Sequence, residues 1–325
     1  FKQANVLRVA AADIMEVIPL MVVSDHLSWI AEVILEQVQS LAWRQLVSRY
    51  GRPVAQGQEP PGFAIIAYGK LGGLELSYGS DLDLVFLHGE GGGTTDGAKP
   101  VENAVFFARL AQRIIHLLTT LTPSGVLYEV DLRLRPSGAS GLLVSNTTAY
   151  AIYQREEAWT WEHQALVRAR AVAGDRRIAR CFEAIREEIL TRPRERGPLC
   201  RDVIEMRERM RASLLKAPPG FFDLKQGQGG IVDIEFMVQY GVLAWASHHP
   251  GLCRYTDNIR LLALLAEAGL MAEADALLLS DAYRAYRAAA HRLTLRGQPA
   301  VVADSEFTDY RARVTGMWRA WMSGD

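Results

Sequence analysis

The sequence predicts an α+β protein: a small α/β domain with helices before it and a larger C-terminal α-helical bundle after it. Two short apolar runs, at 63–68 and 82–87, are typical of buried strands. Residues 1–50 and the chain after about residue 147 instead repeat their apolar positions at the spacing of helices. A stretch rich in Gly, Pro and Gln, at 51–62, separates the first helical part from the strands. These boundaries give three expected parts: an N-terminal helical segment (1–50), an α/β domain (51–150) and a helical bundle (151–325).

Individual elements follow from periodicity and capping. One face of the first segment carries apolar residues at helical spacing, behind a cap at Ser24–Asp25: Ile30, Val33, Ile34, Val38 and Leu41. Further helices are expected around 106–117, at 74–78 and after a capping Asp257. Residues 126–135 alternate between apolar and charged side chains, which predicts a strand with one charged face.

The composition narrows the class of protein. A formal net charge of −1 over 325 residues lacks the basic excess of a general nucleic-acid binder, and no apolar run approaches the ~18–20 residues that span a bilayer. We therefore expect neither nucleic acid nor a membrane as a partner. Three widely spaced cysteines without a CxxC pair are typical of reduced thiols in a cytoplasmic protein: Cys181, Cys200 and Cys253. The chain begins at Phe1 without a leader-like segment, so we expect it to be part of a longer protein.

Asp81 and Asp83 are the strongest candidates for chemistry. They lie two residues apart on a predicted strand, so both carboxylates project from the same face. The apolar run that follows them is unlike a solvated edge. Because two like charges in such a place are costly without a compensating cation, the pair predicts hard divalent ions, Mg²⁺ or Mn²⁺.

Gly72 and Gly73 precede this pair, with seven residues between Gly73 and Asp81. Glycines after a strand let the backbone approach a phosphate chain and direct N–H groups at it. The hydroxyl of Ser80 can donate a hydrogen bond to a phosphate oxygen. A Walker A motif is excluded because Leu71, and not Ser or Thr, follows Lys70.

The order of strand, Gly-Gly, Asp-Leu-Asp and strand resembles the signature of the DNA polymerase β-like nucleotidyltransferase superfamily. The resemblance implies that the two carboxylates bind catalytic metals together with a third carboxylate from a later strand. Asp131 fits that place, on the charged face of the strand expected at 126–135. The alternative for Asp131 is a salt bridge with Arg133 or Arg135. These two arginines can hold a triphosphate bidentately or serve a purely structural role.

Longer segments resemble one family, the glutamine synthetase adenylyltransferases. Four segments carry the resemblance: YGKLGG at 68–73, SDLDL at 80–84, YEVDLRLRPSG at 128–138 and EAWTWEHQAL at 157–166. A fifth segment, GGIVDIEF at 229–236, is similar to one shared with the uridylyltransferase of the nitrogen-regulatory signal protein.

The resemblance implies transfer of AMP from ATP to a tyrosine of glutamine synthetase, with Mg²⁺ or Mn²⁺ as cofactor. It also implies a PII-type signal protein as a partner and glutamine as an effector. Asp81, Asp83 and Asp131 would be both the catalytic residues and the metal ligands. The expected ATP-binding residues are Lys70, Gly72, Gly73, Ser80, Arg133 and Arg135.

The direction of the reaction stays open at the level of the site. Full-length members of the family have two nucleotidyltransferase units, one that removes AMP by phosphorolysis and one that adds it. The segments at 1–6 and 159–163 resemble the C-terminal, adenylylating unit, so addition is the expected activity. The alternatives are removal of AMP and a non-catalytic module whose helical bundle binds the signal protein.

Other polar and aromatic residues give weaker predictions. Asp233 and Glu235 lie two apart on an expected helix, so they do not share a face. For these two acids, a place in the lining of the active-site cleft and a capping or ion-pair role are equally favoured. Trp159 and Trp161 are expected to be core aromatics, and His163 a satisfied surface or interface histidine.

Overall fold

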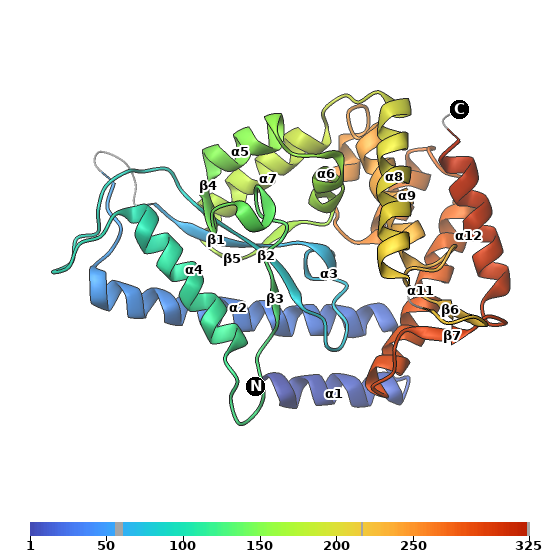
Figure 1. Cartoon of the computed structure of the whole chain (residues 1–325), viewed down its shortest axis with the longest axis horizontal. Coiled ribbons are helices and arrows are strands. Elements are labelled where there is room, and N and C mark those ends of the chain that lie inside the picture. The colour runs from blue at the N-terminus through green and yellow to red at the C-terminus, as the bar shows by residue number, and fades with distance from the viewer. Residues whose placement is uncertain (56–60, 216, 324–325) are drawn as a thin grey trace.

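The computed structural model describes residues 1–55, 61–215 and 217–323 (Figure 1). Residues 56–60 of the loop expected at 51–62 lie outside this range. The helices are α1 (Lys2–Ile14), α2 (Leu20–Tyr50), α3 (Gly69–Gly72), α4 (Asn103–Thr119), α5 (Thr147–Glu156), α6 (Thr160–Val167), α7 (Arg176–Leu190), α8 (Arg196–Leu214), α9 (Ile231–Trp245), α10 (Asn258–Glu267), α11 (Glu273–Leu295) and α12 (Thr308–Trp321). The strands are β1 (Phe63–Ala67), β2 (Leu82–His88), β3 (Val130–Asp131), β4 (Val144–Asn146), β5 (Arg170–Gly174), β6 (Phe221–Asp223) and β7 (Val301–Ala303).

A mixed sheet forms the centre of the first half of the chain. Its strand order is β3-β2-β1-β5, and β4 also pairs with β2. β1 is antiparallel to β2 and β5, whereas β2 is parallel to β3 and β4. The α+β class is therefore confirmed. β5 lies beyond residue 150 and still joins this sheet, and the division of the chain into three parts stays a prediction.

Both faces of the sheet are covered, so β1 is apolar along its whole length. Phe63 and Ile65 pack with α2 and α4, while Ala64 and Ile66 pack with α5 and α7. Figure 1 shows α2 and α4 on one side of the strands and α5 and α7 on the other. Because strand side chains alternate between faces, this arrangement also decides which side each residue of β2 faces.

The N-terminal segment contains two helices, as expected for a helical segment before the sheet. α1 ends at Ile14, and α2 begins after Pro19, whose ring suits the residue before a helix. The cap expected at Ser24–Asp25 is therefore wrong, since Ser24 lies inside α2 and accepts a hydrogen bond from Ser28 through its carbonyl. None of the helices in the described ranges is long and apolar enough to cross a bilayer.

Two other local predictions are also wrong. Of the strand expected at 126–135, only Val130 and Asp131 pair in a sheet. The chain leaves the sheet in a turn, in which Arg135 donates from its N–H to Leu132 at 3.2 Å. The helix expected at 74–78 is absent. A single helical turn, α3, lies earlier in the chain and ends at Gly72, and Leu74 has a left-handed φ of 55°.

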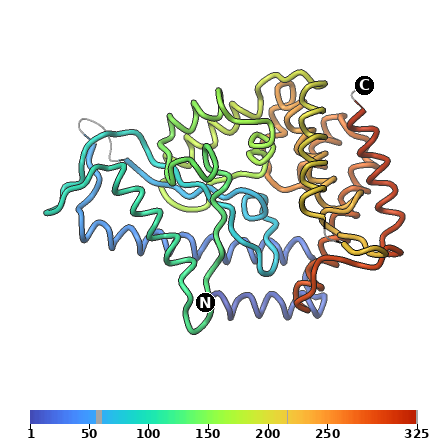
Figure 2. The backbone as a smooth tube through the Cα atoms, in the orientation of Figure 1, coloured from blue at the N-terminus to red at the C-terminus, as the bar shows by residue number. Residues whose placement is uncertain are grey.

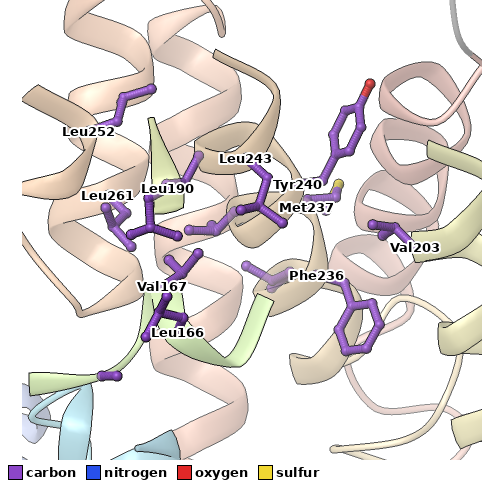
Figure 3. Packing of buried hydrophobic residues seen from close by; sticks show 14 of the residues in the cluster. Leu166, Val167, Leu190, Val203, Phe236, Met237, Tyr240, Leu243, Leu252 and Leu261 are labelled. Atoms are coloured by element: carbon purple, nitrogen blue, oxygen red, sulfur yellow. The ribbon is translucent and has the colours of Figure 1, made fainter. Parts of the chain in front are cut away.

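The second half of the chain is mainly helical. Helix α9 is surrounded by α8, α10, α11 and α12, and its buried residues occur on nearly all of its sides. Figure 3 shows Leu243 of α9 on the side of Leu190, Val167 and Leu166, which belong to α7 and α6, and Met237 next to Tyr240. One apolar core therefore joins the helical half to the face of the sheet that carries Ala64 and Ile66. Figure 2 shows these later segments, coloured yellow to red, gathered at one end of the molecule.

Helix α10 begins as predicted. The Asp257 side chain accepts a hydrogen bond from the N–H of Arg260 at 2.9 Å, which satisfies one of the free donors of the first turn.

Candidate functional site

Asp81 directly precedes β2, and Asp83 is the second residue of this strand. By alternation, Asp83 shares a face with Val85 and Leu87, which pack against α5 and α7. This is the face that the helical half extends, and α3 lies between the sheet and that half (Figure 1). Asp81 is exposed and Asp83 is half-buried. The carboxylate pair therefore lies on the side of the sheet that faces the second half of the chain.

The electrostatic environment of Asp83 is unfavourable for a bare carboxylate. Burial, followed by the charges of Asp81 and Asp131, raises the pKa of Asp83 to about 6. Within the described residues, no side chain or backbone group donates a hydrogen bond to its carboxylate. The backbone of Gly69, with φ at 56°, passes directly against Asp83, so a Cβ at Gly69 would clash with the carboxylate. A cation at this place would offset the cost of holding this negative charge half-buried beside two others.

Asp131 is the neighbour of Asp83 across the β2–β3 ladder, which pairs the two residues in parallel register. Its carboxylate accepts hydrogen bonds from Arg133, at 2.8 Å from Nε and 2.9 Å from the backbone N–H. These bonds lower the pKa of Asp131. The salt bridge with Arg133, one of the two roles considered for Asp131 from the sequence, is therefore present. Its arginine side chain is 83% exposed, so the pair contributes little stability.

The three aspartates do not converge on one point. Across the described ranges, no group of three His, Cys, Asp or Glu side chains is placed to hold a metal ion. The carboxylate of Asp131 is instead paired with the guanidinium of Arg133.

Lys70 and two serines form a polar cluster beside the aspartates. Lys70 Nζ lies 3.1 Å from Ser77 Oγ and 3.4 Å from Ser80 Oγ, and the two hydroxyls are 3.0 Å apart. Burial, followed by the charge of Lys225, lowers the pKa of Lys70 to about 8. The cluster offers donors, an ammonium and two hydroxyls, to an anion next to the carboxylates.

Gly72 and Gly73 have a packing role in this structure. Their N–H groups donate to Tyr68 and Gly69, so neither points at a ligand as the sequence led us to expect. Both glycines are buried, and a Cβ at Gly73 would lie 2.6 Å from the guanidinium of Arg168. Glycine is needed here because Arg168 passes so close. A contact of these two residues with ATP stays a prediction.

Arg135 is occupied by its own turn. Its guanidinium donates to the carbonyls of Leu132 at 2.9 Å, Ala139 at 3.0 Å and Gly141 at 3.4 Å. The structural role considered for this arginine is therefore present, and its contact with a triphosphate stays a prediction.

A buried network, which the sequence analysis missed, ties the segment after α3 to the helical half. Glu75 is fully buried and accepts a hydrogen bond from the N–H of Asn258 at 2.9 Å and another from the Tyr283 hydroxyl at 2.5 Å. Arg168 forms salt bridges with both Glu75 and Glu235. The only signal in the sequence is a lone charge at Glu75 in an otherwise apolar run.

Asp233 and Glu235 both take the ion-pair role. Asp233 binds Arg207 at 2.6 Å and accepts a hydrogen bond from the N–H of Gly229 at 2.7 Å. Glu235 binds Arg168 at 2.6 Å, and although burial opposes ionisation, Arg168 and then Lys225 keep the pKa of Glu235 low. The expectation that Trp159 is a core residue is wrong, since it is 71% exposed.

His163 gives a testable dependence of stability on pH. Its ring bonds the carbonyl of Gln154 at 2.9 Å, while burial, together with Arg194 and Arg192, lowers its pKa to about 4. The unfolded chain binds this proton near pH 6.5. The stabilisation is therefore complete above pH 6.5 and is lost as the pH falls toward 4. We expect the free energy of unfolding, measured with urea, to fall over this range.

The matched variants are His163→Gln and His248→Gln, since His248 is exposed. His163→Gln should reduce the pH dependence, whereas His248→Gln should keep it. Burial also lowers the pKa of His291, to about 3, so part of the dependence remains in both variants. Equal slopes in the two variants would rule out His163 as the source.

Two protein families match different parts of the chain. The family model described as glutamate-ammonia ligase adenylyltransferase matches residues 1–185, and the one described as GlnD PII-uridylyltransferase matches residues 204–300. Curated relatives named bifunctional glutamine synthetase adenylyltransferase/adenylyl-removing enzyme are similar over nearly the whole chain. Those of Nitrosococcus oceani, Pseudomonas aeruginosa and Thioalkalivibrio sulfidiphilus are 56%, 55% and 57% identical over 100%, 98% and 99% of it. The chain spans 34% of the length of each relative.

The families and the relatives are named for one kind of chemistry, the transfer of a nucleotidyl group, and nucleotidyltransferases are therefore the class of protein that this chain is similar to. The model that covers residues 1–185 takes in more than half of the chain. The chain belongs to the glutamate-ammonia ligase adenylyltransferase family.

Proposed function

We propose that this chain transfers AMP from ATP to a tyrosine hydroxyl of glutamine synthetase and releases pyrophosphate, as part of the control of nitrogen assimilation. The observation that carries the proposal is Asp83, a half-buried carboxylate that accepts no hydrogen bond from any described residue and is affected by the charges of Asp81 and Asp131. Membership of an adenylyltransferase family and the relatives' names support the reaction and the target. A cytoplasmic setting is supported by three free cysteines: Cys181, Cys200 and Cys253.

The proposal includes an arrangement of domains. Residues 51–150, with the helices of 1–50 behind them, would be a polymerase β-like nucleotidyltransferase domain. Residues 151–325 would be a helical domain that closes the site. The parallel register of Asp83 and Asp131 supports the first assignment, and the buried network around Glu75 supports the second.

Asp81, Asp83 and Asp131 would hold Mg²⁺ or Mn²⁺. The donor set suits hard cations because it offers carboxylate oxygens only, and the raised pKa of Asp83 reflects charge that a cation would compensate. Mg²⁺ needs only one or two carboxylates when phosphates complete its shell, so the pairing of Asp131 with Arg133 does not oppose the fit. When bound, the ions neutralise the triphosphate and favour the ionised form of the acceptor hydroxyl.

The chain's own residues would then bind the nucleotide and move a proton. Lys70 and Ser80 donate to the phosphates, with Gly72 and Gly73 behind them, and Arg133 and Arg135 at the far side. Asp131 accepts the proton of the tyrosine hydroxyl as its oxygen forms a bond with the α-phosphorus. The bond from that phosphorus to the β-phosphate oxygen breaks, and pyrophosphate leaves.

Removal of AMP by phosphorolysis is the second candidate, because the relatives' names include an adenylyl-removing activity. The same site would then join AMP to inorganic phosphate, giving ADP and free tyrosine. We further propose that a PII-type signal protein and glutamine regulate the reaction. The match of residues 204–300 to a PII-uridylyltransferase supports the signal protein as a partner.

The direct test supplies the chain with unmodified glutamine synthetase, Mg²⁺ and α-labelled ATP, and then maps any labelled residue. We expect one labelled tyrosine and release of pyrophosphate. A parallel reaction with modified synthetase and phosphate tests removal. Calorimetric titration of ATP with and without Mg²⁺ distinguishes these two activities, addition and removal of AMP, from a non-catalytic module that binds the signal protein. Absence of metal-dependent ATP binding would contradict the proposed activity.

A further inference from the structure

The serines that lie against Lys70 are the first and last residues of one tight turn, at 77–80. The N–H of Ser80 donates to the carbonyl of Ser77 at 3.2 Å, which closes the turn. Gly79, its third residue, has a left-handed φ of 67°, as is typical of a type II turn. The conformation of this turn therefore decides where the two hydroxyls stand relative to the Lys70 ammonium.

Tyr78, the second residue of the turn, joins it to two helices from opposite ends of the chain. Its hydroxyl donates to Asp13 Oδ2, on α1, at 3.0 Å. Its ring packs edge-on against the imidazole of His291, on α11, with 5.4 Å between the ring centroids. The side chain of Asp13 is 19% exposed and that of His291 is 3% exposed, so water competes little for either contact.

Helix α1, which carries Asp13 near its end, is also fixed at its beginning. Lys2 Nζ lies 4.0 Å from the centre of the Tyr128 ring, and Gln3 donates to the carbonyl of Ser124 at 2.6 Å. Residues 124–128 lead directly into β3. Figure 1 shows α1 beside α2, with its first residues next to the loop that leads to β3. Asp13 is therefore a firm anchor for the turn at 77–80.

The turn needs such an anchor at its tip. Gly79 is exposed, and a Cβ placed on it would have no described atom within 4 Å, so the tip is unpacked on that side. Glycine also leaves the backbone more conformations than any other residue. Without a fixed Tyr78, the turn would have to be ordered when a ligand binds, and that ordering lowers affinity.

We propose that Tyr78 is a positioning residue for the nucleotide: through its hydrogen bond to Asp13, it holds Ser77 and Ser80 where they bind the phosphates of ATP together with Lys70. The inference rests on the proposed function. It adds that α1, a helix outside the sheet and the helical half, supports the phosphate-binding turn.

The test is Tyr78→Phe, which removes the hydroxyl and keeps the ring against His291. With Mg²⁺ and glutamine synthetase, we expect the KM for ATP to rise about fivefold, a part of the effect of losing one hydrogen bond to a charged group. The kcat should stay unchanged, because the turn holds the phosphates equally before and during transfer. Calorimetric titration of ATP with Mg²⁺ should show a similar loss of affinity.

Tyr153→Phe is the matched control, since Tyr153 is also half-buried and donates to Glu162 Oε1 at 2.7 Å. It should keep the KM for ATP. Asp13→Asn keeps an acceptor for the Tyr78 hydroxyl and should retain most of the ATP affinity, whereas Asp13→Ala should behave like Tyr78→Phe. The double variant of Tyr78→Phe and Asp13→Ala should be no weaker than either single variant, because both changes break the same bond.

The outcomes separate the inference from the proposed function. If the unmodified chain transfers AMP and Tyr78→Phe has the same KM for ATP as Tyr153→Phe, the inference is wrong and the proposed function stands. Additive losses in the double variant would show that Tyr78 does not act through Asp13, and would also overturn the inference. If the unmodified chain binds ATP without transferring AMP, the proposed function fails, and the calorimetric comparison of the same variants decides the inference. If it binds no ATP, both fail.

Discussion

Asp83→Asn should abolish AMP transfer, with a loss of at least about a thousandfold, while the protein remains folded. Asparagine matches the size of aspartate but has no charge to hold a divalent cation, and such a cation stabilises the transition state by several kcal/mol. The measurement is incorporation of label from α-labelled ATP into glutamine synthetase. Asp81→Asn should behave in the same way, because the two carboxylates act together.

The fold should tolerate the change at Asp83. Among the described residues its carboxylate has no hydrogen-bond donor, and two like charges act on it, so asparagine removes repulsion instead of a favourable contact. We therefore expect the melting temperature without metal to be no lower than that of the unmodified chain. Addition of Mn²⁺ should raise the melting temperature of the unmodified chain by mass action, and should not do so in the variant.

The control is Asp275→Asn, an exposed aspartate in the first turn of α11. It should keep full activity and the response to metal. Full transfer by Asp83→Asn with metal and ATP present would exclude the mechanism proposed for this site.

Arg168→Met should cost about 3–5 kcal/mol of the free energy of unfolding, the usual effect of breaking a buried ion pair from one side. The arginine side chain is only 5% exposed and lies between Glu75 and Glu235. Methionine preserves much of the volume but leaves Glu235 largely buried without its ion-pair partner, and Glu75 with only Arg287, at 3.7 Å, as a counter-charge among the described residues. The measurement is urea unfolding at pH 7, with the two-state character checked by two probes.

Arg155→Met is the matched control. Arg155 pairs with Glu188 on the surface, where the two side chains are 42% and 45% exposed, so this change should cost at most about 1 kcal/mol. Adding Glu75→Gln to Arg168→Met should recover part of the loss, since it removes a buried charge that keeps Arg287, at 3.7 Å, as its only described ion-pair partner. Equal destabilisation by Arg168→Met and Arg155→Met would show that the network does not hold the two halves together.

The Arg168 network also bears on activity. Glu75 leads directly to Ser77 and Ser80, so loosening its anchor should loosen the cluster that holds Lys70. We expect Arg168→Met to weaken ATP binding at temperatures at which the variant is still folded.

Local patterns in the sequence determined the elements that carry the aspartates. β1 and β2 form where apolar runs end in Gly or His, and α4 forms where apolar residues repeat at helical spacing. These elements depend on neighbours a few residues apart, so their physical causes are present in the local sequence. The resemblance implied a third carboxylate from a later strand, whereas the register that pairs Asp131 with Asp83 comes from the structure.

Only the tertiary structure decided which distant groups meet. β3 is two residues long because the turn after Asp131 takes the backbone away from the sheet, which alternation does not reveal. Gly72 and Gly73 are needed for the close approach of Arg168, and their N–H groups are used within α3. The partners of Glu75 depend on how the helical half packs on the sheet. Such contacts join residues far apart in the chain, and only the packing of the apolar core brings them together.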